Sequence, residues 1–132
     1  MNIHQGSSRY QQSQVLTAGR EQLLLLAYDG ILRFLSRAHR GLEQRDYHEK
    51  HLGISRAQTL IIELRRTLDF AASPELAHSL TRIYTYLIEE LAQIDAHDDD
   101  PRLQHLIHLV TEMREAWRDA AKQAARGSEE ER

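Results

Sequence analysis

Apolar residues recur at intervals of three and four along most of the chain, which is the spacing of helices with one buried face. The clearest case is the series from Leu76 to Ile94, whose steps are four, three, four, four and three residues. Similar stripes precede and follow it, and nothing in the pattern indicates a sheet. The pattern predicts four helices, over residues 20–42, 47–70, 74–96 and 101–125.

Start signals support three of these helices. Asp46, with a glutamate three residues later, has the form of a capping box. Ser73 and Pro74 provide a cap and a first helical residue, and Asp100 and Pro101 repeat that arrangement. Because the connections are short, about four to six residues, they leave no room for crossovers. The expected fold is therefore all-α, an antiparallel up-and-down four-helix bundle.

The two ends of the chain differ from the bundle in composition. Residues 1–18 are polar, with only Val15 and Leu16 as an apolar pair near the end, and are expected to form an extended N-terminal arm that hinges at Gly19. Residues 19–125 form the predicted bundle. Residues 126–132 are charged and include a Gly-Ser pair, so they are expected to be a disordered tail.

Several helices carry a second apolar row beside the first. A four-helix bundle buries about three of seven positions on each helix, so the surplus needs another explanation. One possibility is a wide core with scattered exposed residues. The other is a groove that receives amphipathic helices of a partner, with the arm as its cover. The second rows comprise Ile54, Ile61, Ile62, Tyr84, Ile88, Leu106 and Leu109.

Gly30 lies inside the first predicted helix, where glycine costs about 1 kcal/mol relative to alanine. Two explanations are open. A neighbouring helix approaches closely at Gly30, or Tyr28 and Asp29 form a polar edge that positions the arm or a partner. Trp117, late in the fourth helix, is expected to line the core or the groove.

Composition narrows the function further. A chain of 132 residues can bury one core, and the absence of cysteine is compatible with a reducing cytoplasm. The N-terminus lacks the apolar core of a signal peptide, and no apolar run approaches the ~20 residues of a membrane span. The net charge of −3 is mixed along the helices, which argues against nucleic acid as a partner. A cytoplasmic protein is expected.

The sequence gives little support for a catalytic or metal-binding site. Histidines three residues apart occur twice, but two nitrogens do not make a metal site. Glu75 and His78 have the spacing of di-iron bundles, which require that motif twice. We expect no metal, no cofactor and no catalytic residue. His51 is similar to the exposed histidine of phosphotransfer bundles, although the lysine of that pattern is missing, so a phosphotransfer bundle stays as an alternative.

Three blocks carry a family resemblance. Tyr10 with Val15-Leu16-Thr17-Ala18, followed by Tyr28-Asp29-Gly30, resembles the FliS family of flagellar export chaperones. Ile83-Tyr84-Thr85-Tyr86-Leu87 and Met113-Arg114-Glu115-Ala116-Trp117 support the match. The chain departs from the family at Gly19-Arg20, where Ser-Pro is common, and at Ala27, where a larger apolar residue is usual.

The resemblance implies a cytoplasmic chaperone, not an enzyme. It would bind the disordered C-terminal segment of flagellin, prevent premature polymerisation and deliver flagellin for type III flagellar export. An export-gate component or a co-chaperone would be a further partner, and the free protein would be a monomer or an arm-exchanged dimer. A structural bundle that self-associates is the other alternative. The expected partner-binding residues are Tyr10, Gln14, Val15, Leu16, Thr17, Ala18, Tyr28, Asp29, Ile61, Tyr84, Ile88, Leu106 and Leu109.

Overall fold

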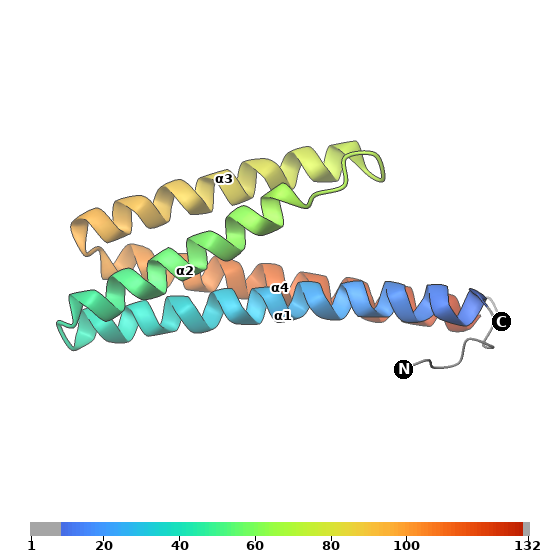
Figure 1. Cartoon of the computed structure of the whole chain (residues 1–132), viewed down its shortest axis with the longest axis horizontal. Coiled ribbons are helices and arrows are strands. Elements are labelled where there is room, and N and C mark those ends of the chain that lie inside the picture. Colours follow the sequence, from blue (N-terminus) through green and yellow to red (C-terminus); the bar gives the residue numbers. More distant parts are fainter. Residues whose placement is uncertain (1–8, 131–132) are drawn as a thin grey trace.

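Four antiparallel helices make up the molecule. This computed structural model describes the backbone of residues 9–130 and the side chains of residues 19–127, 129 and 130. The helices are α1 (Arg9–Glu43), α2 (Tyr47–Arg66), α3 (Pro74–His97) and α4 (Asp100–Glu130). They run alternately up and down, with α1 beside α2 and α4, and α3 beside α2 (Figure 1). The predicted all-α four-helix bundle is confirmed.

The helix starts follow local chemistry. The Asp46 carboxylate accepts a hydrogen bond of 3.2 Å from the Glu49 backbone N–H, so the predicted cap of α2 is confirmed. Ser73 precedes α3, but its side chain makes no capping bond, and Pro74 is the first helical residue. At α4 the cap is Asp99, one residue earlier than predicted, because its carboxylate accepts from the Arg102 N–H at 3.2 Å.

The bundle's two ends differ from the prediction. Helix α1 begins at Arg9, so residues 9–18 are helical where an extended arm was expected, and α4 continues to Glu130 where a tail was expected from 126. No proline interrupts either segment, and glutamine, alanine, leucine and arginine favour helix enough to outweigh the single glycine, Gly19 or Gly127, in each. Helix α2 is shorter than predicted and ends at Arg66.

Close approach of α1 and α2 depends on glycines. A Cβ at Gly53 would lie 2.5 Å from the Phe34 carbonyl oxygen, and one at Gly41 would lie 2.6 Å from the Lys50 backbone nitrogen. Gly30 packs more loosely, since its Cβ would lie 3.1 Å from Leu60 Cδ1. The close approach predicted at Gly30 is confirmed, and the two tighter glycines were not predicted. They draw α1 and α2 together at the end that carries the α1–α2 turn.

The helices separate toward the other end. Figure 1 shows α2 and α3 rising away from α1 and α4, while α1 and α4 extend past the connection between α2 and α3. Of the neighbouring helix pairs, α3 and α4 make the fewest close backbone approaches. The bundle therefore has a closed end, near the α1–α2 and α3–α4 turns, and an open end, near the α2–α3 connection.

Candidate partner-binding surface

Four of the residues expected to bind a partner belong to the core. Tyr28, Ile61, Tyr84 and Leu106 are at most 2 % exposed, so the closed bundle cannot present them to another protein. The core face of α3 passes through Tyr84, not through its neighbour Ile83, which is 36 % exposed. Adjacent residues differ by about 100° around a helix, so a register error of one residue exchanges the inner and outer rows.

The other predicted residues have different surroundings. Asp29 is half-buried and forms an ion pair of 2.6 Å with Arg114 of α4. Ile88 and Leu109 are partly buried and pack against the core from its edge. The remaining six, all within 10–18, have side chains that lie outside the described residues: Tyr10, Gln14, Val15, Leu16, Thr17 and Ala18.

A pair of buried tyrosine hydroxyls joins α1 to α3 through the middle of the bundle. Tyr28 and Tyr84 are 1 % and 2 % exposed, and their hydroxyl oxygens are 2.8 Å apart. Burial raises the pKa of Tyr28, and the neighbouring Tyr84 and Trp117 partly oppose that shift. Burial also raises the pKa of Tyr84, and the adjacent Tyr28 raises it further. Each hydroxyl satisfies the other, which removes the cost of an unpaired buried polar group.

The three sequence blocks that carried the resemblance meet around this pair. Tyr28 from the first block bonds Tyr84 from the second, and Trp117 from the third lies beside Tyr28. Asp29 from the first block pairs with Arg114 from the third. The blocks are therefore one structural layer that ties α1, α3 and α4 together. Tyr28, Asp29, Tyr84, Arg114 and Trp117 thus hold the bundle together, whereas Ile83 and Tyr86 of the second block are exposed.

The surplus of apolar surface is present, but in other positions. On α3, Leu76 is 49 % exposed, Ile83 36 % and Tyr86 44 %. They lie at helical spacing with Glu90, which forms a bidentate pair of 2.8 Å bonds with Arg102 of α4, so this row faces the gap between α3 and α4. The partly buried Leu109 and Met113 share a face of α4 with Arg102. We call these apolar residues the α3/α4 apolar surface: Leu76, Ile83, Tyr86, Leu109 and Met113.

A second apolar area lies on the other side of the open end. Leu23 and Leu26 of α1 are both more than half exposed. Gly30 opposes Leu60 in this antiparallel pair, so Leu26 comes level with Leu64 of α2, one turn further along. The divergence of α2 from α1 leaves this leucine row uncovered. Both apolar areas therefore result from the opening of the bundle.

Ion pairs connect α2 to the end of α3 at the closed end. Lys50 has a side chain 8 % exposed, and its Nζ donates to Asp95 at 2.8 Å and contacts Asp98 at 2.7 Å. Burial lowers the pKa of Lys50, but the bonds to the two carboxylates outweigh it, and the net shift is upward. Burial raises the pKa of Asp95, and bonds from Lys50 and His51 bring it below its usual range. His51, the residue of the phosphotransfer alternative, thus belongs to a structural network.

The described side chains contain no group of three or more His, Cys, Asp or Glu placed to hold a metal ion. Among helices of the described region, none has both the length and the apolar character needed to cross a membrane. The chemistry that the described surface offers is apolar contact and ion pairing, as expected of a surface that binds another protein.

Comparison with known proteins gives the family of this chain. Residues 3–124 match the family described as "Flagellar protein FliS". The flagellar secretion chaperone FliS of Bacillus subtilis is 33 % identical over 91 % of this chain and 89 % of its own length. The proteins of the same name from Campylobacter jejuni and Escherichia coli are 31 % and 27 % identical, over 83 % and 91 % of this chain and 86 % and 92 % of theirs. The matched range contains all three blocks that meet at the tyrosine pair.

Proposed function

The chain belongs to the FliS family, a family of chaperones and not of enzymes, and we propose that it binds the C-terminal segment of flagellin before export. The bound segment would be one that is disordered in the free subunit. Covering it would prevent premature polymerisation in the cytoplasm and keep flagellin in a form that the type III flagellar apparatus can export.

The exposed α3/α4 apolar surface is the observation that carries this proposal. Leu76, Ile83 and Tyr86 follow one face of α3 at the spacing that meets an amphipathic helix, and Leu109 borders them from α4. A segment that folds on binding spends several kcal/mol on ordering, so it requires a large apolar contact. The leucine row of Leu23 and Leu26 would extend that contact across the open end.

The family resemblance adds the start of the chain to the same interface. Within the six residues of 10–18 assigned to binding, Val15 and Leu16 are the apolar pair. We propose that they contact flagellin together with the open end of the bundle. An export-gate component or a co-chaperone would then use a part of the molecule that flagellin leaves free.

Calorimetry with a flagellin C-terminal peptide tests the binding surface. We expect Ile83→Asp to weaken binding by more than tenfold, because a carboxylate buried against an apolar helix loses its hydration without a partner. Leu16→Asp should weaken binding comparably. The fold of each variant is checked by its helical circular dichroism. For Ile83→Asp it should match the wild type because Ile83 lies outside the buried core.

The matched control is Ala92→Asp, which adds the same charge to α3 at an exposed position on a different face from Leu76, Ile83 and Tyr86, and removes only a methyl group. It should retain most of the affinity. Wild-type affinity in Ile83→Asp would remove the α3/α4 apolar surface from the interface. Absence of binding by the wild-type protein, together with a stable oligomer in light scattering, would instead favour the self-associating bundle.

A further inference from the structure

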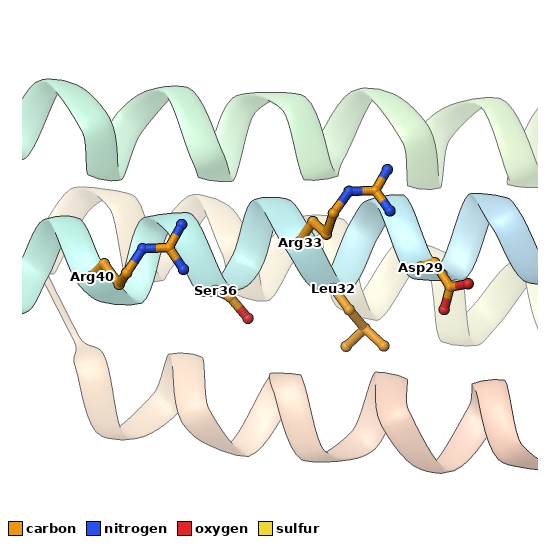
Figure 2. A pocket seen from close by; sticks show the side chains of 5 residues that line it. All are labelled: Asp29, Leu32, Arg33, Ser36 and Arg40. Atoms are coloured by element: carbon orange, nitrogen blue, oxygen red, sulfur yellow. The ribbon is translucent and has the colours of Figure 1, made fainter.

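A second surface, on the outward side of α1, has a different chemistry. Five residues of α1 line a shallow depression of about 570 Å³: Asp29, Leu32, Arg33, Ser36 and Arg40. Figure 2 shows Arg33 and Arg40 extending toward the α2 side of α1, and Leu32, Ser36 and Asp29 lying toward α4. We call this depression the α1 trough. It has arginines along one edge and a leucine and a serine along the other.

Both arginines of the trough lack a bonded carboxylate among the described side chains, although Glu49 attracts Arg40 without a direct contact. Asp29 is neutralised by Arg114 at 2.6 Å, and Arg37, which lies between the two trough arginines, is neutralised by Glu49 at 2.5 Å. Arg33 and Arg40 make no ion pair and no hydrogen bond with any described side chain. Two guanidinium groups therefore face solvent on a chain whose net charge is negative.

Local packing fixes where one of these arginines lies. The Arg33 Nη2 atom is 3.7 Å from the position that a Cβ would take at Gly30, so the guanidinium folds back over the glycine. Gly30 thus serves the helix contact with Leu60 and also gives Arg33 a place against the backbone of α1.

The distance between the two arginines determines which kind of anionic ligand can bind both of them. Arg33 and Arg40 are seven residues apart, or about 10.5 Å along the axis of α1. A single phosphate or carboxylate engages one guanidinium in a bidentate pair but does not span that distance. Two acidic side chains seven residues apart on a partner helix have the same repeat and face the same way. Leu32, which directly precedes Arg33 and lies on the α4 side of the trough, offers an apolar contact to a residue beside one of the two acids.

We propose that the α1 trough binds an acidic helix of a second protein partner, with carboxylates at positions i and i+7. The trough lies apart from the α3/α4 apolar surface, because α1 and α3 lie diagonally opposite in the bundle (Figure 1). It borders the leucine row of α1, since Leu26 is seven residues before Arg33 on the same face. An anionic membrane fits the trough less well, since patches that bind anionic lipids gather about four to eight Lys or Arg residues and the trough has only Arg33 and Arg40. The bundle could thus hold an apolar segment and an acidic helix at the same time.

The test uses NMR with a synthetic alanine-rich helical peptide that carries two glutamates seven residues apart and a leucine between them. We expect the side-chain Nε–H signals of Arg33 and Arg40 to shift on titration. The same peptide with both glutamates changed to glutamine should bind about tenfold more weakly, since each exposed ion pair contributes up to about a factor of five. Higher salt should weaken the glutamate peptide only.

Variants distinguish the site from general charge effects. Arg33→Glu with Arg40→Glu should lose about tenfold or more in affinity for the glutamate peptide. Arg82→Glu is the control, because Arg82 is exposed on α3 and its one described side-chain contact is a 3.5 Å bond to Ser79. It should bind the peptide within about twofold of wild type. Both variants should bind the flagellin peptide unchanged, so failure here is separable from failure of the proposed function.

Three results would overturn the proposal. Shifts confined to other residues would place the peptide elsewhere. If Arg82→Glu weakened binding of the glutamate peptide equally, the loss would come from net charge and not from the trough. Shifts of Arg33 and Arg40 with inorganic phosphate or with phosphatidylglycerol vesicles, but not with the peptide, would assign the trough to a free anion or to a lipid surface.

Discussion

At the scale of single residues, the hydroxyls of Tyr28 and Tyr84 couple α1 to α3 through the core. Tyr84 stands beside the apolar stripe of α3, and Tyr28 belongs to a family motif. Their roles were expected to concern a partner. Both are core residues whose hydroxyls satisfy each other at 2.8 Å. The pattern of one helix cannot reveal this, because the partner hydroxyl is 56 residues away in the chain.

Replacing both tyrosines should cost less stability than the sum of the two single replacements. Tyr84→Phe leaves the Tyr28 hydroxyl buried without its hydrogen-bond partner, which should lower the free energy of unfolding by about 1–3 kcal/mol. The double variant Tyr28→Phe, Tyr84→Phe removes both polar groups and should be destabilised by less than the sum of the two single changes. Urea unfolding followed by circular dichroism measures all four proteins. Strict additivity would mean that the hydroxyls are not coupled.

The same pair predicts sensitivity to alkali. Both tyrosines have pKa values raised by burial, so above about pH 10 the unfolded chain releases phenolic protons that the folded chain retains. Their contribution to stability is complete below about pH 10 and is lost as the pH rises further. Lys50, whose folded pKa is also raised, acts in the same direction. Unfolding free energies measured from pH 8 to pH 11 should fall, and the double phenylalanine variant should fall less steeply.

At the scale of helices, the spacing of apolar residues and the capping residues predicted where the four helices lie. They did not predict where each helix ends or which of its faces is buried. Asp46 marks the start of α2 because a cap is a local interaction. The far ends of α1 and α4 were not predicted, because Gly19 and the Gly127-Ser128 pair are local signals for the end of a helix and both helices continue through them. Ile83 and Tyr84 illustrate the remaining limit. Both fit a helical stripe, and only the neighbouring helices determine which one is buried.

Glycine substitutions test how α1 and α2 approach. Gly53→Ala would place a Cβ 2.5 Å from a backbone oxygen of α1, which can move only if the helices separate. We expect a loss of about 2 kcal/mol or more, because overpacking outweighs the gain of about 1 kcal/mol in helix propensity. Gly19→Ala is the control, since nothing lies within 4 Å of its Cβ position. It should stabilise the protein by about 0.5–1 kcal/mol. Thermal unfolding of both variants checks the signs, and a stabilising Gly53→Ala would contradict this geometry.

At the scale of the whole molecule, the bundle is closed by glycines and charges at one end and open at the other. Gly41 and Gly53 bring α1 and α2 together where Lys50 ties α2 to the end of α3. Short loops were enough to predict an up-and-down bundle from the sequence. The divergence of the helices was not predictable, because it depends on the close contact of Gly53 with Phe34 and Ala38 of another helix. The candidate binding surface was not predictable for the same reason, since the divergence of the helices exposes it.

This asymmetry should appear in hydrogen exchange. Amides of residues 50–57 and 91–97, near the charged network, should exchange at least about tenfold more slowly than those of 60–66 and 76–83, which lie at the open end with fewer neighbours. The charged network is part of the cause, so Lys50→Met should speed exchange at the closed end and leave the open end little changed. Equal protection at both ends in the wild type would contradict this account. Saturation with a flagellin C-terminal peptide should then slow exchange mainly at the open end, because a ligand stabilises the segments that it covers and orders.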